Sequence, residues 1–265
     1  DNIKQIEQWY RMNKSSNFIN WYSAMEIHGV PSLNTIYADN SGNIFYAYNG
    51  MFPDRNNNLD WSGYLPGWTS YAVWDSINTF VSVPQLLNPN SGVLFSTNQT
   101  PFYVTDGNDN LSENNYPIEW GIEKHMNNRA HRANELFSAE HSISYKDLKK
   151  IKFDKCYSTK STMALHINDI INAIHNDSNP SLNQAEYVLS NWDLCTDIEN
   201  KNAALALLAT EPFLKFEYEK MNDSILVNST INAVDLLKSN HGNIQVALGK
   251  IQRLIRGEAD LAIGG

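Results

Sequence analysis

The sequence NTIYADNSGNIFYAYNGMFPDR, residues 34–55, contains two short apolar and aromatic runs separated by a polar connection. The runs are residues 35–38 and 44–48, and the connection, residues 40–43, reads Asn-Ser-Gly-Asn. Because Gly and Asn tolerate a left-handed backbone, this spacing predicts a β-hairpin. Pro53 has no backbone N–H for a strand ladder, so we expect the second strand to end before it.

The second run of this hairpin is apolar or aromatic on both sides. In a strand, Phe45 and Ala47 would point to one face, and Ile44, Tyr46 and Tyr48 to the other. A strand that is covered on both faces belongs inside a layered fold. The sequence therefore predicts an antiparallel sheet with further elements packed on each side.

Composition excludes several classes of protein. The chain has 265 residues and 42% hydrophobic residues, which is enough for a sizeable core. A net charge of −9 with only 20 Lys and Arg argues against a nucleic-acid binder and against a basic membrane-surface helix. No apolar run approaches the ~20 residues of a membrane span, so we expect no span. The absence of an initial Met and the ending Gly264-Gly265 suggest a processed product or a piece of a longer chain.

The spacing of apolar residues and the composition of the sequence change near its middle. Residues 1–28 have helical spacing of apolar side chains, and residues 56–116 are dense in Asn, Gly, Pro and Trp and predict irregular structure. From about residue 118 onward the helical period dominates. We therefore predict an α+β fold, with residues 1–117 as a sheet-and-loop portion and residues 118–265 as a helical portion of one continuous domain fragment.

Capping residues predict where the later helices begin. Ser144 with Asp147 three residues later forms a capping-box pattern. Asn183 and Ser229 are expected to cap two further helices. Residues 203–209 are almost wholly apolar, which is typical of a buried helix.

The two cysteines, Cys156 and Cys195, are too far apart in sequence for a CxxC redox or zinc pattern. Two ordinary thiols and a single disulfide both remain open, because sequence separation does not show how close two Cα atoms come.

Motif searches find no catalytic set by spacing alone. The chain has no GxSxG, HExxH, P-loop or dinucleotide glycine pattern. His125 and His131 are six residues apart and would lie on different faces of a helix, so packing or surface roles are preferred to metal binding. Asp106 and Asp109 give residues 106–110 the oxygen density of a calcium loop, but Leu111 stands where such loops place Gly. A solvated polar loop is the preferred interpretation, with calcium as the alternative.

Several stretches in one order resemble the β chain of the penicillin acylase family. The hairpin sequence of residues 37–55 is similar to that family's strand pair. Further matching positions follow in the same order and spacing: Leu65-Pro66-Gly67, Asn88-Pro89, Gly92, Asn98, Pro101, Arg129, Arg132, Trp192-Asp193 and residues 253–257. The LPGxTS stretch and the RLxRG ending look most like the branch of acyl-homoserine-lactone acylases and aculeacin A acylase.

The resemblance implies an αββα sandwich and N-terminal nucleophile hydrolysis. In such enzymes a precursor cleaves itself to expose a Ser, whose α-amine activates its own hydroxyl. This chain begins with Asp1, so the nucleophile is expected to lie outside it, and the chain alone is expected to be inactive. The implied partners are a small acyl amide substrate, the α chain and the rest of the β chain. A periplasmic or secreted location is implied. No cofactor is expected, with a structural calcium ion at Asp106 and Asp109 as the alternative.

The resemblance also implies three site residues. Asn98 matches the family Asn whose amide helps to form the oxyanion hole, a suitable role for a neutral donor. Arg129 matches the family arginine near the active site, and Arg132 lies one helical turn later. The structural alternatives are a loop Asn bonded to its own backbone and two exposed helix-face charges.

Two functions are therefore weighed. The first is an amidase fragment that would hydrolyse an acyl amide through an acyl-enzyme. The second is a non-catalytic carbohydrate-binding module, whose Trp- and Asn-rich first half would stack on sugar rings. The second explains the abundance of Trp but predicts neither the hairpin followed by Asn98 nor the arginine pair after it, so the first is favoured.

Overall fold

The computed structural model describes residues 4–56, 58–74, 76–139, 142–215 and 217–264. It divides into two compact units, Asp1–Met126 and Asn127–Gly265, which are described separately. Within the described ranges, no helix combines the length and the apolar character that crossing a bilayer requires.

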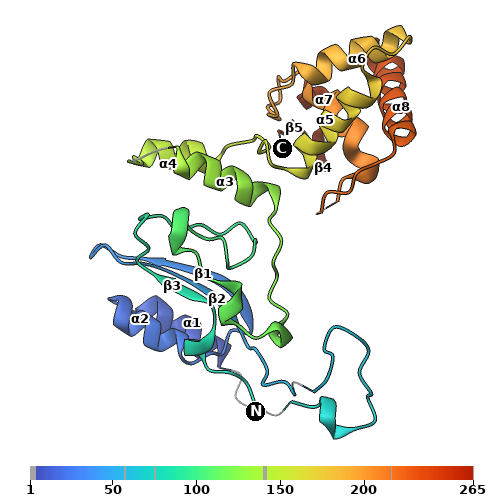
Figure 1. Ribbon diagram of the computed structural model, residues 1–265. Helices are drawn as coiled ribbons and strands as arrows, with labels where there is room; N and C mark the ends of the chain where they lie inside the picture. The colour runs from blue at the N-terminus through green and yellow to red at the C-terminus, as the bar shows by residue number, and fades with distance from the viewer. Residues whose placement is uncertain (1–3, 57, 75, 140–141, 216, 265) are drawn as a thin grey trace. The chain divides into compact units, whose positions relative to one another are not determined.

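The first unit is built on a three-stranded antiparallel sheet in the order β1-β2-β3. Two helices and several 3₁₀ turns accompany it (Figure 1). The bounds are α1 Gln5–Lys14, α2 Phe18–Met25, β1 Ser32–Ala38, β2 Ile44–Gly50 and β3 Gln85–Leu87, with 3₁₀ turns η1 Ser70–Ala72, η2 Phe80–Ser82, η3 Gly107–Asp109, η4 Glu113–Asn115 and η5 Ile118–Trp120.

The predicted hairpin is confirmed, with one residue more in its connection. Ala38 pairs with Ile44, so the connection is residues 39–43. The carboxylate of Asp39 accepts hydrogen bonds from the backbone N–H groups of Ser41 (2.9 Å) and Asn43 (3.0 Å). A side chain that satisfies loop donors in this way fixes the turn and therefore the register of the strands.

The prediction that the second strand is covered on both faces is also confirmed. Phe45 and Ala47 pack with Trp21 and Met25 of α2, which lies with α1 against one face of the sheet (Figure 1). On the opposite face Tyr46 is fully buried and its hydroxyl donates to Asn34 Oδ1 (2.7 Å). Strand β2 is thus the central strand of a layered unit.

The irregular structure expected for residues 56–116 is interrupted by β3. Phe45 pairs with Leu87 and Ala47 with Gln85. Three residues are too few to show strand periodicity, so only the pairing with β2 identifies this strand.

The second unit is mostly helical, as predicted. Its helices are α3 Asn128–Ser138, α4 Tyr145–Lys152, α5 Thr162–Ile174, α6 Pro180–Ser190, α7 Ala203–Thr210 and α8 Asp223–His241, with 3₁₀ turns η6 Glu211–Phe213 and η7 Leu248–Lys250. An unpredicted hairpin, β4 Arg253–Arg256 with β5 Ala259–Ala262, follows them. Together with the sheet of the first unit, this confirms a mixed α and β fold with antiparallel sheets.

Helix starts are predicted correctly in one case and wrongly in two. Ser144 and Asp147 form the expected capping box. The helix assigned to Asn183 is capped instead by Asn179, because Pro180 at the first helical position fixes the start there. Ser229 is not a cap: α8 begins six residues earlier, after Asn222, and the Ser229 hydroxyl donates to the Ala209 carbonyl.

Helix α7 lies at the centre of the second unit's core. Residues 203–206 are buried, and side chains of α5, α6 and α8 complete the cluster around them. Ala at most of these positions lets the neighbouring helices approach closely. The apolar run of residues 203–209 is thus a buried helix, as predicted.

A disulfide joins Cys156 to Cys195, which settles the open question about the cysteines. The two residues face each other across an antiparallel bridge, with Cα atoms 3.9 Å apart. On one side Tyr157 N–H donates to the Leu194 carbonyl (2.8 Å), and on the other Thr196 N–H donates to the Lys155 carbonyl (3.1 Å). The bridge ties the segment before α5 to the segment before α7.

Replacing both cysteines by Ser should lower the free energy of unfolding by about 3–4 kcal/mol, because the bond closes a loop of 39 residues in the unfolded chain. Urea unfolding of the variant and of the unaltered protein, with and without reductant, measures this. Reductant should reproduce the loss in the unaltered protein and leave the variant unchanged; equal stability of all samples would contradict the prediction.

His166 is an ionisable side chain inside the helical core. It is fully buried in α5 between the rings of Phe213 and Tyr218, each with its centroid 5.0 Å away. Among the described residues neither ring nitrogen has a hydrogen-bond partner. Burial lowers the pKa of His166, and the charge of Asp169 only partly opposes this effect. The folded state therefore favours the neutral ring.

We expect this histidine to make stability fall with acidification. The pKa of His166 is lower in the folded than in the unfolded state, so its contribution is complete above the unfolded value of ~6.5 and is lost as pH falls toward the folded value. The loss is at most about 1.4 kcal/mol per pH unit. Unfolding measured from pH 7.5 to 5 should show a smaller slope for His166→Leu.

Ile170→Leu is the matched control, because Ile170 is buried in the same helix and the change alters no titratable group. It should keep the slope of the unaltered protein. Burial also lowers the pKa values of His28 and His131, so His166→Leu should reduce the slope without abolishing it. An unchanged slope would contradict the prediction.

Candidate functional site

Asn98 lies exposed on a short loop whose neighbouring residues are buried. Its φ of 65° is in the left-handed region, which Asn tolerates better than most residues. Phe95, Gln99 and Thr100 beside it are all at most 5% exposed. Phe95 N–H donates to the Val104 carbonyl (3.0 Å) and closes the loop at its base. The fold thus presents the Asn98 side chain on a tightly held backbone.

Gln99 holds this loop from inside. Its Oε1 accepts from the backbone N–H of Thr97 (2.6 Å) and from the Thr97 hydroxyl (3.1 Å). Its Nε2 donates to the carbonyls of Phe95 (3.3 Å) and Tyr103 (2.8 Å). Nothing in the sequence singles out Gln99, because a polar residue beside Asn98 carries no periodic or motif signal of its own.

The two calcium candidates lie at the 3₁₀ turn η3. Both carboxylate oxygens of Asp109 accept from Asn90, one from its backbone N–H and one from its side-chain amide. Within the described residues, no group of three or more His, Cys, Asp or Glu side chains gathers as a metal site would require. Asp109 therefore acts as a link between two loops, and calcium binding by Asp106 and Asp109 stays an untested prediction.

Arg129 and Arg132 lie one turn apart on α3, in the second unit, whereas Asn98 lies in the first. The helix begins with Asn127, whose side chain accepts from the Ala130 N–H (2.8 Å). Arg129 is exposed in the first turn. A role for Arg129 near an active site stays a prediction from the family resemblance.

Arg132 makes extensive contacts within its own unit. Its Nε and a terminal nitrogen donate to the two carboxylate oxygens of Asp154, at 2.8 and 3.0 Å, and its other terminal nitrogen lies 3.3 Å from Glu135. The Glu135 carboxylate in turn accepts from the Ser158 hydroxyl (2.6 Å). Such a two-pronged arginine–carboxylate pair fixes orientation as well as charge. Arg132 thereby ties α3 to the segment that carries Cys156.

This ion-pair network shifts the ionisation of both acids in one direction. Burial raises the pKa of Asp154, but the hydrogen bonds from Arg132 and from the Cys156 N–H outweigh it and hold that pKa below its ordinary value. The pKa of Glu135 is lowered in the same way, against burial, by Ser158 and Arg132. Both carboxylates are therefore ionised at neutral pH.

The two histidines considered as metal ligands have separate roles. His125 precedes α3, so the expectation that both lie on one helix is wrong; its Nδ1 lies 3.1 Å from a Glu123 carboxylate oxygen. His131 lies within α3, where burial and the charge of Lys160 lower its pKa. The preference for packing and surface roles over metal binding stays a prediction.

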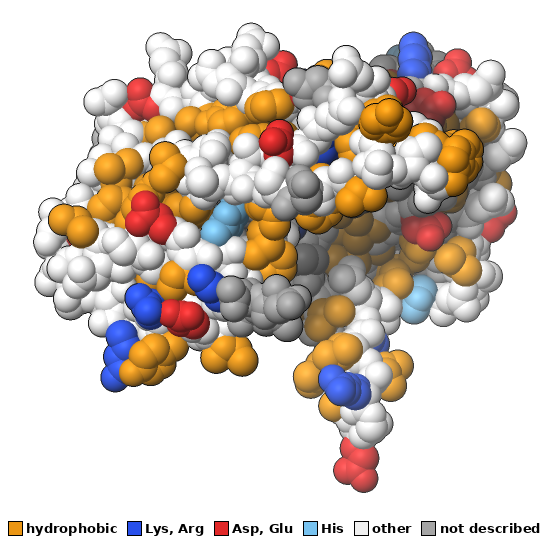
Figure 2. All heavy atoms as spheres, turned by 90° about the horizontal axis from the view of Figure 1, so that it is seen from below, with side chains coloured by type: hydrophobic (Ala, Val, Ile, Leu, Met, Phe, Trp, Pro, Cys, Tyr) orange, Lys and Arg blue, Asp and Glu red, His pale blue; other side chains and the backbone are white. Residues whose placement is uncertain are grey.

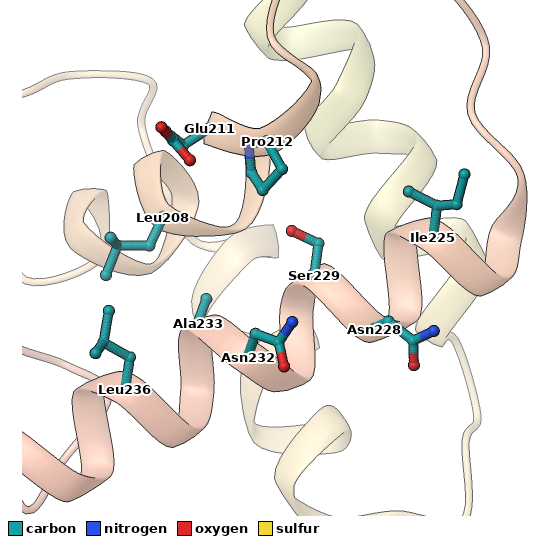
Figure 3. A pocket seen from close by; sticks show the side chains of 9 residues that line it. All are labelled: Leu208, Glu211, Pro212, Ile225, Asn228, Ser229, Asn232, Ala233 and Leu236. Atoms are coloured by element: carbon teal, nitrogen blue, oxygen red, sulfur yellow. The ribbon is translucent and has the colours of Figure 1, made fainter.

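A surface groove of about 430 Å³ lies between α7 and α8 (Figure 3). Leu208, Ile225 and Leu236 form its apolar part, and Asn228 and Asn232 contribute amides. Its one hydroxyl, that of Ser229, is engaged with the Ala209 carbonyl (2.7 Å). No base lies within hydrogen-bonding distance of that hydroxyl among the described residues, so the groove is an amphipathic surface without an activated nucleophile.

The comparison with known families decides what kind of protein this is. The family model described as penicillin amidase matches residues 1–247, which is nearly the whole chain. The chain belongs to the penicillin amidase family. Membership supports an amide hydrolase of the acylase class, as the sequence resemblance implied.

Two penicillin amidase relatives show how much of such a protein the chain represents. It is 31% identical over 99 residues to the penicillin G acylase of Escherichia coli, a match that covers 37% of this chain and 12% of that protein. The structure is similar to that of a thermostable penicillin G acylase from Alcaligenes faecalis, with a TM-score of 0.61 and 16% identity, covering 92% of this chain and 53% of that one. The second likeness shows the shared fold. The chain thus spans only part of the length of either relative.

The Arg132 network should be worth measurably more than an exposed ion pair. Arg132→Met should lower the free energy of unfolding by about 1.5–3 kcal/mol, because it leaves two partly buried carboxylates without their charged donor. Denaturant unfolding at low and at 0.5 M salt tests this, and the loss should persist at high salt.

Lys150→Met is the control for Arg132→Met. Lys150 pairs with Asp147 at 3.4 Å, but its side chain is 68% exposed, so the change should cost less than about 1 kcal/mol. Equal losses for the two variants would show that Arg132 contributes no more than an ordinary surface charge.

Proposed function

We propose that this chain is part of an amidohydrolase that cleaves an acyl chain from an amine-bearing head group through an acyl-enzyme. The observation that carries the proposal is the penicillin amidase match over residues 1–247. The candidate substrates are acyl-homoserine lactones, lipopeptides and penicillin-type amides, with the first two favoured by the LPGxTS and RLxRG stretches. Roles in quorum quenching or in antibiotic biosynthesis would follow from these substrates.

In this proposal Asn98 donates a hydrogen bond to the oxyanion of the tetrahedral intermediate. A neutral amide is a suitable donor because it needs no change of ionisation during the reaction. Its backbone is held by buried neighbours while its side chain is exposed. A donor fixed before substrate binds loses little energy to reorganisation when the oxyanion forms.

The remaining roles are divided between this chain and parts of the enzyme outside it. The nucleophilic Ser, with its α-amine as base, belongs to a part that this sequence does not include. The family resemblance assigns Arg129, in the first turn of α3, to the active site, and Arg132 holds that helix on Asp154. The chain alone is then inactive, and its partners are the α chain and the rest of the β chain. The complete enzyme would act in the periplasm or outside the cell.

Exposed aromatic residues favour one alternative, a carbohydrate-binding surface in the first unit. Tyr64 and Tyr71 are more than 70% exposed, and Trp68 is 87% exposed. Hydrophobic side chains reach the surface beside acidic and basic ones on the face shown in Figure 2. Such rings can stack on sugars. Sugar binding by residues 64–71 would not depend on Asn98, which lies outside that segment. The variants below therefore separate the two functions.

Asn98→Gly in the complete, processed enzyme should lower kcat by ~10²–10³ and leave KM nearly unchanged, since the donor acts only in the transition state. Gly is chosen because it accepts a φ of 65° without strain, which Ala would not. Asn98→Asp, which also tolerates this backbone but offers no amide donor, should show a similar loss. Steady-state kinetics on an acyl amide measure both.

Asn88 is the matched control, because it too has a left-handed backbone, with φ 49°. Its side chain accepts from Ile44 N–H (2.8 Å) and so joins β2 to the loop after β3. Asn88→Gly should lower stability and leave kcat within about threefold. Retention of activity by Asn98→Gly at a normal melting temperature would overturn the oxyanion role.

A further inference from the structure

The side-chain amide of Gln99 is buried and forms its hydrogen bonds within one loop. The residue is 1% exposed, and its four hydrogen bonds reach Thr97 twice, Phe95 and Tyr103. A side-chain amide has one oxygen acceptor and one nitrogen with two donors, so these contacts use its capacity. None of them involves a residue beyond the loop of residues 95–103.

The contacts lie on both sides of Asn98. Oε1 fixes Thr97, the residue before it, through backbone and hydroxyl, and Nε2 joins the two arms of the loop at Phe95 and Tyr103. Because Gln99 itself is the residue after Asn98, its own backbone is anchored by the same bonds. Gln99 therefore holds the residue before Asn98 directly, and it joins the two arms of the loop that flank Asn98.

A left-handed backbone at a residue other than Gly needs such support. Asn adopts this conformation more readily than most residues, but the conformation persists only where the surroundings determine it. At Asn88 the residue's own side chain provides it, through Ile44 and Asn43. At Asn98 the neighbouring side chain of Gln99 contributes support, through Thr97, Phe95 and Tyr103.

We propose that Gln99 is a positioning residue for catalysis, which sets the direction of the Asn98 amide by fixing the loop on both sides of it. The inference rests on the proposed oxyanion role of Asn98. Gln99 does not touch the substrate in this proposal. It affects the reaction rate only by orienting Asn98, and the substrate is the acyl amide of the proposed acylase.

The experiment is a double-mutant cycle in the complete, processed enzyme. Gln99→Met keeps the length and removes all four hydrogen bonds. With Asn98 present it should lower kcat about tenfold or more and leave KM within about threefold, because misplacing a catalytic group costs up to ~10²-fold. With Asn98→Gly present, the same change should lower kcat by less than about twofold, since no donor is left to misplace.

Thr97→Val provides a second probe in case Gln99→Met is processed poorly. It removes one bond to Gln99 Oε1 and keeps the backbone bond. It should lower kcat about two- to fivefold with Asn98 present and leave kcat unchanged in the Asn98→Gly enzyme. Melting temperatures should fall equally in both backgrounds.

The outcomes separate this inference from the proposed function. If Gln99→Met lowers kcat by the same factor in both backgrounds, or not at all with Asn98 present, the positioning role is overturned while the role of Asn98 stands. If Asn98→Gly alone retains activity, the oxyanion role fails and the inference fails with it. Coupling in kcat without coupling in melting temperature supports the proposal.

Discussion

Burial of strand β2 on both faces is the constraint on which the first unit depends. Phe45 and Ala47 lie on the face that packs against α1 and α2, and the buried Tyr46 lies on the opposite face. A central strand must be paired along both edges, which β1 and β3 provide. Asn88, at the end of β3, then returns a side-chain hydrogen bond to Ile44. The chain leaving this edge leads directly to the loop that carries Asn98.

The loop of residues 95–103 shows how a polar segment becomes rigid without regular structure. Its buried side chains include the amide of Gln99 as well as the ring of Phe95, and Gln99 satisfies the Thr97 N–H and the carbonyls of Phe95 and Tyr103. Buried polar groups are tolerated when all are satisfied, and they then favour a single conformation. This leaves the exposed residue of the loop, Asn98, on a fixed backbone.

The second unit obtains its order from two different sources. Its core is apolar packing around α7. Helix α3 lies outside that core and is held by the charged network of Arg132, Asp154 and Glu135, next to the disulfide of Cys156 and Cys195. A disulfide and charge-assisted hydrogen bonds thus stabilise the part of the unit that buries little apolar surface.

The sequence by itself determined the features that depend on neighbours along the chain. These are the hairpin, the helical second half, the capping box at Ser144 and the family, which was recognised from motifs in order. The tertiary structure decided what depends on distant partners: the short strand β3, the Cys156–Cys195 bond, the start of α8 and the four contacts of Gln99. Local propensity has no information about such partners, because pairing and burial arise only when the chain is folded. Asn98 belongs to both groups. Its match to the family motif follows from the sequence, but its left-handed backbone and the hydrogen bonds of Gln99 around it follow only from the structure.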